Sequence, residues 1–266
     1  MKRLFLPLIA MTMICLFNPK SFAQDYKALI ADSDARVYQS ADGLKLPYRL
    51  FKPDNYDPAK KYPLIIFLHG AGERGTNNIA QLVHPQVLSL ISGENRTKNP
   101  SFLIAPQCEN GKRWCEVNWS ETTPHTTPAQ PSDGMKCLFE VVDGLRKEFS
   151  LDASRLYVTG MSMGGYGTCD FVARRGNEVA AYVPLCGGAD DAAICKFKNA
   201  AAWFFHGDKD GAVPTARSRS AAAALKAAGC NVQYTELPGR GHGIWTEAYY
   251  TPGFADWLFS QRNNAK

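Results

Sequence analysis

The sequence predicts an α/β protein with a mostly parallel central sheet, helices on both of its faces and an antiparallel lead-in at the N-terminal edge. Short apolar runs rich in branched and aromatic residues recur along the chain, and helix-like stretches separate them. This alternation is typical of βαβ units, in which each crossover helix packs against the sheet. The runs are apolar at nearly every position, which indicates strands buried on both faces.

The individual elements follow from these patterns. The lead-in is a predicted hairpin across residues 40–51, with Asp42-Gly43 supplying the turn. Buried strands are then expected at residues 63–68, 102–105, 156–159, 179–185, 202–205 and 232–237. The clearest helices are expected at residues 135–149, 163–175, 215–228 and 245–261. Residues 107–132 show neither the apolar periodicity of a helix nor that of a strand. We therefore expect a long loop over the carboxyl edge of the sheet, where open α/β sheets bind ligands.

The first 23 residues are predicted to be a cleaved signal peptide. Lys2 and Arg3 precede an apolar stretch at residues 4–17, and Ser21-Phe22-Ala23 offers small residues for cleavage. The stretch is shorter than the roughly 20 residues that span a bilayer, so we expect no stable membrane anchor. We therefore expect a secreted or periplasmic protein in which residues 24–266 form a single domain.

The nearly balanced charge of the chain argues against nucleic acid and anionic lipid as partners. The whole chain has 30 basic and 25 acidic residues, and removal of the leader takes away Lys2, Arg3 and Lys20, which leaves a net charge of +2. No run of basic residues remains. We therefore expect neither nucleic acid nor anionic lipid as a partner.

The cysteines permit disulfides but do not define them. Seven follow the leader: Cys108, Cys115, Cys137, Cys169, Cys186, Cys195 and Cys230. An odd number leaves at least one thiol free, and the short loops Cys108 to Cys115 and Cys186 to Cys195 are the natural candidates for pairing. Their spacing is not that of zinc ligands, so we expect no metal site and no cofactor.

The strongest chemical motif is Gly160-Met-Ser162-Met-Gly164, which fits G-x-S-x-G. It follows a predicted strand and opens a predicted helix, which is the context in which this motif exposes a nucleophilic serine on a tight turn. A serine hydroxyl needs a base to take its proton, and that base needs an orienting acid. Ser162 is therefore the candidate nucleophile.

The acid and the base are expected later in the chain, in the order serine, acid, histidine. Asp208 and Asp210 share a loop after the strand at residues 202–205, and spacing alone does not choose between them. His242 lies between glycines in the loop after the last strand, which would let its imidazole reach the serine. His242 is the candidate base.

Donors for an oxyanion are expected after the first buried strand. His69-Gly-Ala71-Gly72 occupies that position, so the backbone N–H of Ala71, with that of Met163, is predicted to form the oxyanion hole. A glycine-rich turn without catalytic duty is the alternative. Glu73 is expected to play a supporting structural role.

The remaining histidines and the tryptophans have weaker interpretations. His69 and His206 end buried strands and are expected to brace loops, and His84 is expected on the surface or in packing. Aromatic side chains near the carboxyl edge of the sheet could stack on a sugar or an aromatic acyl group, or could simply pack the loops down. These residues are Trp114, Trp119, His125 and Trp245, of which Trp119, His125 and Trp245 are the candidate substrate contacts.

Five segments together resemble one branch of a known superfamily. They are LHGAGERG at 68–75, APQC at 105–108, YVTGMSMGGYGT at 157–168, FHGDKDGAVP at 205–214 and LPGRGHGIW at 237–245. This combination resembles the α/β-hydrolase superfamily, in particular exported bacterial "predicted peptidase" proteins, and is similar to feruloyl and acetyl-xylan esterases and polyhydroxybutyrate depolymerases. The resemblance implies the α/β-hydrolase fold and identifies Asp210, the second Asp of the HG-x-x-D pattern, as the acid.

The resemblance implies a secreted serine hydrolase that cleaves carboxylic esters by a Ser-His-Asp acyl-enzyme mechanism, with acyl esters of polysaccharides as candidate substrates. Two alternatives stay open. One is a serine peptidase of the prolyl-oligopeptidase superfamily, although we expect no gating propeller in 266 residues. The other is a non-catalytic binding protein on a hydrolase scaffold, which would be free to lose the nucleophile, base or acid.

Overall fold

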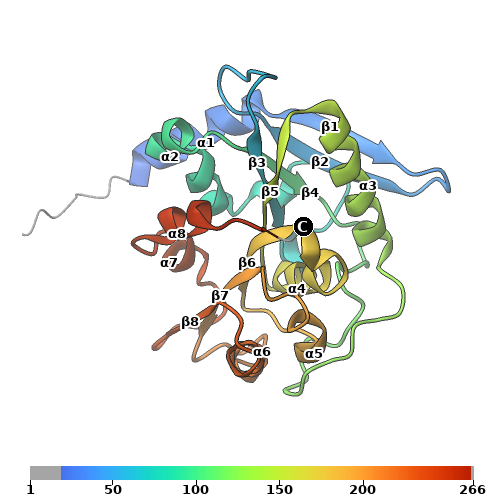
Figure 1. Ribbon diagram of the computed structural model, residues 1–266, viewed down its shortest axis with the longest axis vertical. Coiled ribbons are helices and arrows are strands. Elements are labelled where there is room, and N and C mark those ends of the chain that lie inside the picture. The colour runs from blue at the N-terminus through green and yellow to red at the C-terminus, as the bar shows by residue number, and fades with distance from the viewer. Residues whose placement is uncertain (1–18, 265–266) are drawn as a thin grey trace, which may run out of the picture.

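The computed structural model describes residues 19–264, which build one eight-stranded sheet flanked by helices (Figure 1). The strand order is β1-β2-β4-β3-β5-β6-β7-β8. The strands are β1 (Asp34–Gln39), β2 (Lys45–Phe51), β3 (Tyr62–Leu68), β4 (Phe102–Pro106), β5 (Leu151–Met161), β6 (Val179–Leu185), β7 (Ala201–Gly207) and β8 (Val232–Leu237). The predicted α/β-hydrolase fold with a mostly parallel sheet is confirmed.

The lead-in is antiparallel, as the sequence predicts. β1 pairs with β2, and β2 pairs with β4, both in antiparallel register, whereas every pair from β4 to β8 is parallel. Gly43 has φ +87° in the connecting turn, which is why the Asp-Gly pair suits it. β3, β4, β6 and β7 are buried at every position, since helices cover both faces.

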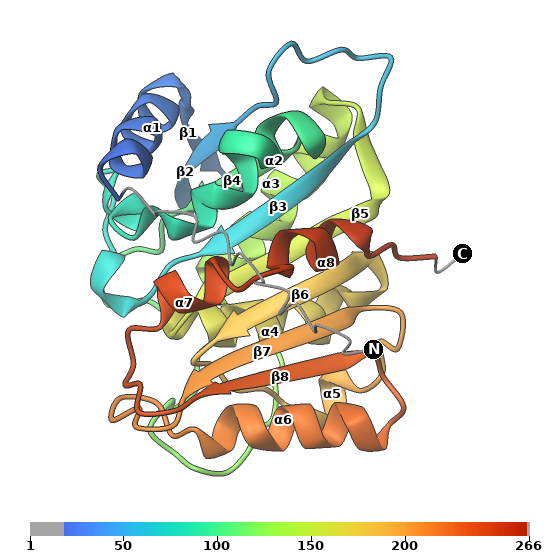
Figure 2. The ribbon, with the colours of Figure 1, turned by 90° about the vertical axis from the view of Figure 1, so that its left-hand side faces the viewer.

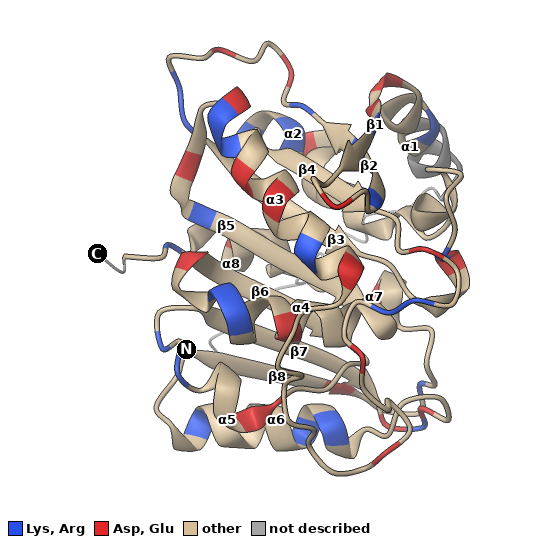
Figure 3. Ribbon diagram, turned by 90° about the vertical axis from the view of Figure 1, so that its right-hand side faces the viewer, with Lys and Arg blue, Asp and Glu red and all other residues tan. Residues whose placement is uncertain are grey.

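Two layers of helices enclose the sheet. The helices are α1 (Pro19–Asp32), α2 (Gly93–Lys98), α3 (Asp133–Glu148), α4 (Met163–Arg175), α5 (Asp191–Ile194), α6 (Ala216–Ala227), α7 (Trp245–Tyr249) and α8 (Phe254–Ser260). α1, α2, α7 and α8 lie on one face (Figure 2), and α3, α4, α5 and α6 lie on the other (Figure 3). Each layer has its own apolar core against the sheet. Figure 3 shows that acidic and basic residues are interspersed along the ribbon of the second layer.

Short 3₁₀ helices occupy several of the connections between these elements. They are η1 (Ala71–Glu73), η2 (Ala80–Leu82), η3 (Pro85–Ile91) and η4 (Gly176–Glu178). Residues 107–132 form no helix or strand, in agreement with the predicted loop.

One predicted helix is wrong in extent. The stretch 245–261 is two helices, α7 and α8, and not one. Pro252 cannot continue a helix, and Gly253 adopts the left-handed conformation with φ +79°, so the chain turns between them.

Most of the predicted signal peptide lies outside the described residues, and α1 begins within its last five positions. Among the described helices, none has the length and apolar character needed to cross a bilayer. Neither candidate disulfide, Cys108 to Cys115 nor Cys186 to Cys195, is present among the described residues, where all seven cysteines carry free thiols. The thiols have other partners: Cys115 donates to Asp170 Oδ1 at 3.5 Å, and Cys186 donates to the carbonyl of His242 at 3.4 Å.

Candidate active site

Ser162 stands on a strained turn between β5 and α4. Its backbone has φ +56° and ψ −118°, a conformation that only a tightly held non-glycine residue adopts. The flanking glycines make this turn possible. A Cβ on Gly164 would lie 1.9 Å from the carbonyl oxygen of Leu68, and one on Gly160 would lie 2.4 Å from that of Gly164. β3 and β5 therefore pack closely enough to present the Ser162 hydroxyl at the end of the sheet.

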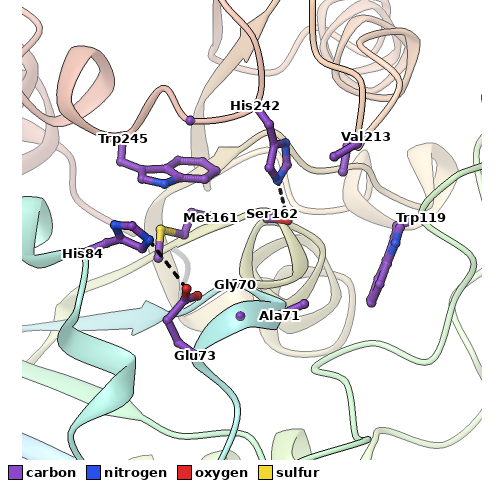
Figure 4. A pocket seen from close by; sticks show the side chains of 13 residues that line it. Gly70, Ala71, Glu73, His84, Trp119, Met161, Ser162, Val213, His242 and Trp245 are labelled. Carbon is purple, nitrogen blue, oxygen red and sulfur yellow. Dashed lines mark hydrogen bonds and ion pairs between the residues drawn. The ribbon is translucent and has the colours of Figure 1, made fainter.

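The loops after β7 and β8 bring two further side chains to this serine. Nε2 of His242 lies 2.8 Å from Oγ of Ser162 (Figure 4), and Nδ1 of His242 lies 2.7 Å from Oδ2 of Asp210. Because the Asp210 carboxylate can only accept, the proton sits on Nδ1, and the Nε2 lone pair faces the serine hydroxyl. Ser162, Asp210 and His242 thus form one continuous hydrogen-bonded chain.

Asp210 is held by more than His242. Its side chain is 0 % exposed, Oδ1 accepts from the N–H groups of Ala212 at 2.8 Å and Val213 at 3.0 Å, and Nε2 of buried His206 lies 3.1 Å from Oδ2. Burial alone would raise the pKa of Asp210, but the hydrogen bonds from His206, His242 and the two amides outweigh it and hold the pKa well below its usual range. The acid is therefore a fixed carboxylate.

Asp208, the rival in the same loop, has a different environment. Its Oδ1 is buried and has no hydrogen-bond partner among the described residues. The bond that orients the imidazole of His242 goes to Asp210 instead. The structure therefore makes the choice that spacing left open.

The two backbone N–H groups predicted for the oxyanion hole belong to residues close to Ser162. Ala71 opens η1 and lines the cavity in front of Ser162 (Figure 4), and Met163 is the first residue of α4. Among the described residues, neither N–H donates to a protein acceptor, so both are available to a ligand. Their role in holding an oxyanion remains a prediction.

His69 braces this region, as the sequence analysis expects. Its Nε2 accepts from the N–H of Cys108 at 2.9 Å, and its Nδ1 lies 2.6 Å from the carbonyl of Gly70. Burial lowers the pKa of His69 to about 4, helped by the charge of Arg74. A neutral imidazole therefore ties the segment after β3 to the segment after β4.

A cavity of about 410 Å³ opens in front of Ser162. Figure 4 shows Trp119 and Val213 on one side of the serine, and Trp245, His84 and Glu73 on the other. Its lining residues are Gly70, Ala71, Gly72, Glu73, His84, Trp119, Met161, Ser162, Ala212, Val213, His242, Gly243 and Trp245. The ring of Trp245 also packs edge-on against His242, with 5.4 Å between centroids.

Two of the aromatic candidates lie elsewhere. His125 does not line this cavity, because its Nδ1 is bonded to Arg217 and its ring packs against Tyr166. Burial and the neighbouring Arg217 lower the pKa of His125 to about 4. Trp114 is fully buried and donates to the carbonyl of His69 at 3.1 Å, so it packs its loop down. Trp119 and Trp245 remain the candidate substrate contacts.

Glu73 and His84 are cavity residues that the sequence patterns did not predict. Nε2 of His84 lies 3.6 Å from Oε1 of Glu73, and both side chains face the cavity (Figure 4). The position of Glu73 in the sequence indicates its place near the site, because it lies only two residues beyond Ala71, in the turn that carries the predicted oxyanion donor.

One group of side chains has the spacing of metal ligands. Ligand atoms of Cys186, His206 and Asp210 lie within 4.8 Å of one another. However, Oδ2 of Asp210 already lies 2.7 Å from Nδ1 of His242 and 3.1 Å from Nε2 of His206. Nδ1 of His206 in turn lies 2.7 Å from Oγ of Ser218. A metal ion there would compete with the bond that orients His242.

Comparison with known proteins finds similarity to hydrolases and esterases. Residues 123–251 match the Dienelactone hydrolase family. A thermostable esterase of known structure is 33 % identical with a TM-score of 0.82, over 88 % of this chain and 64 % of that one.

Two curated relatives match over shorter segments. A bifunctional acetylxylan esterase/xylanase of Neocallimastix patriciarum is 23 % identical over 150 residues, which are 56 % of this chain and 19 % of the relative. Dipeptidyl aminopeptidase A of Saccharomyces cerevisiae is 25 % identical over 143 residues, which are 53 % of this chain and 13 % of the relative. The chain therefore spans less than a fifth of either curated relative.

Proposed function

We propose that this chain, a member of the α/β-hydrolase superfamily, is a serine hydrolase that cleaves carboxylic esters. The observation that carries the proposal is the hydrogen-bonded chain from Oγ of Ser162 through the imidazole of His242 to Oδ2 of Asp210, at the floor of an accessible cavity. An imidazole with its lone pair on the hydroxyl and its other nitrogen on a fixed carboxylate is built to remove the serine proton.

The first half of the reaction forms an acyl-enzyme. His242 Nε2 takes the proton of Ser162 while Oγ bonds to the ester carbonyl carbon, and the oxygen that gains the negative charge accepts from the N–H groups of Ala71 and Met163. Collapse of this intermediate breaks the bond to the alcohol oxygen, which takes the proton from His242. The acyl group is left on Ser162.

Water completes the cycle by the same route. It gives a proton to His242 as its oxygen attacks the acyl carbon, and the Oγ–C bond then breaks as that proton returns to Ser162. Asp210 stabilises the imidazolium in both halves and itself stays ionised. No step requires a cofactor.

We propose acyl esters of polysaccharides as the substrate class. The likeness to an esterase of known structure and to an acetylxylan esterase/xylanase supports this choice, as do the rings of Trp119 and Trp245 at the cavity, which suit stacking on a sugar or an aromatic acyl group. We further propose export by the leader at residues 1–23, with neither nucleic acid nor a membrane as partner.

A fluorophosphonate probe tests whether the chain is an enzyme. We expect covalent labelling of Ser162, identified by peptide mass, and loss of labelling in Ser162→Ala. Ser120→Ala, at an exposed position in the loop at residues 107–132, is the matched control and should label like the unaltered protein. A folded protein that does not label would favour a binding protein on a hydrolase scaffold.

A substrate panel tests the reaction class. Aryl acetates, methyl ferulate and short peptide amides are compared by kcat/KM, and we expect turnover of the esters. The match to a dipeptidyl aminopeptidase supports a serine peptidase as the second candidate. Amide turnover without ester turnover would decide for that candidate.

A further inference from the structure

The cavity carries a carboxylate that the proposed mechanism does not use. Glu73 ends η1, is only 9 % exposed, and points its carboxylate into the cavity (Figure 4). Among the described residues that line the cavity there is no Lys or Arg. The wall next to the nucleophile is therefore negatively charged.

This carboxylate lies close to the reacting atoms. A methyl group built on Gly70 would be 2.9 Å from Oε2 of Glu73 and 3.6 Å from Cβ of Ser162. One methyl group would thus touch both side chains. An ester bound at Ser162 with a substituent on this side of the cavity would contact Glu73.

The Glu73 carboxylate is not occupied by a protein hydrogen-bond donor. Within the described part of the chain, no group donates a hydrogen bond to either of its oxygens, and its nearest partner is Nε2 of His84 at 3.6 Å. The adjacent Arg74 donates to the carbonyls of Ala71 and Lys112 and not to Glu73. Both oxygens are therefore free to accept a hydrogen bond from a hydroxyl group of a molecule bound in the cavity.

We propose that Glu73, together with His84, binds a hydroxyl group of the substrate next to the scissile ester and disfavours substrates with an anionic group there. This inference rests on the proposed esterase function and specifies the substrate that the site selects. A hydroxyl can donate to Glu73 and accept from the imidazole N–H of His84, whereas an ammonium group can only donate. Trp245 stands on the same side and offers a ring face to a sugar (Figure 4).

The test compares acetates that differ only in the alcohol: propyl, 2,3-dihydroxypropyl, choline and carboxymethyl. In Glu73→Gln we expect the ratio of kcat/KM for the dihydroxypropyl ester to that for the propyl ester to fall about tenfold, since a hydrogen bond to a charged acceptor is lost. We expect the ratio for the carboxymethyl ester to rise. Ratios within one enzyme cancel any loss that all substrates share, so a merely structural role of Glu73 would not move them.

Methyl hydroxyacetate against methyl acetate places the hydroxyl on the acyl side, and a fall in either series supports the proposal. Glu94→Gln, an exposed acid in α2, is the matched control and should leave the ratios unchanged. Unchanged ratios in Glu73→Gln would overturn the inference. A fall in kcat/KM for choline acetate alone would also overturn it, because Glu73 would then bind a cationic group and not a hydroxyl. Failure of the unaltered protein to hydrolyse any acetate would instead reject the esterase function itself.

Discussion

Replacing Asp210 by Asn tests the arrangement on which the proposed chemistry depends. If Oδ1 of the new amide keeps the N–H groups of Ala212 and Val213, its NH₂ group faces Nδ1 of His242. Two donors cannot share that bond, so the imidazole must move its proton to Nε2. Nε2 then faces Ser162 as a donor and cannot take the serine proton.

The size of the effect follows from what is lost. The wrong tautomer and the missing negative charge together cost about 10⁴ in kcat in an enzyme with this arrangement, or about 5.5 kcal/mol of transition-state stabilisation. The assay is kcat with an aryl acetate, with circular dichroism and thermal unfolding to verify the fold. Asp208→Asn is the matched control, and we expect it to retain activity within about threefold because Asp208 does not contact His242.

The reasoning would be refuted by the reverse pattern. If folded Asp210→Asn keeps activity within tenfold of the unaltered protein while Asp208→Asn loses it, the hydrogen bond from His242 to Asp210 does not orient the base.

Two predictions concern stability. Burial lowers the pKa of His69 to about 4 from 6.5, so the unfolded chain binds the proton first as the pH falls. We expect the free energy of unfolding, measured with urea, to drop by on the order of 3 kcal/mol between pH 6.5 and 4 because of this group. In His69→Gln the free energy of unfolding should depend less steeply on pH. An equal dependence in both proteins would contradict the lowered pKa of His69. Gly164→Ala should destabilise the folded protein by several kcal/mol, because the new methyl group clashes with the Leu68 carbonyl. Gly144→Ala, in open space within α3, should instead stabilise the folded protein by about 1 kcal/mol. Thermal unfolding measures both variants, and equal melting temperatures would speak against the clash.

Much of the fold could be predicted because it depends on local pattern. β6 and β8 have the predicted bounds, as does α4, since apolar runs and helical periodicity are properties of contiguous residues. The break between α7 and α8 was equally local, because Pro252-Gly253 is a helix-ending pair, and was overlooked. Ser162 was predicted for the same reason: its glycines fit a turn whose neighbours are strand and helix.

The tertiary structure decided what depends on residues distant in the chain. Spacing does not distinguish Asp208 from Asp210, and the family resemblance that favours Asp210 gives no geometry. The meeting of the β7 and β8 loops places His242 against Asp210. From sequence, Glu73 is only a turn residue, but the fold places its carboxylate in the wall of the cavity. His125 lies outside the cavity, where it contacts Arg217. Sequence by itself determined which segments form strands and where the nucleophile stands, because those depend on neighbouring residues. The contacts that surround Ser162 depend on how loops distant in the chain meet at the end of the sheet, and local sequence patterns do not specify those contacts.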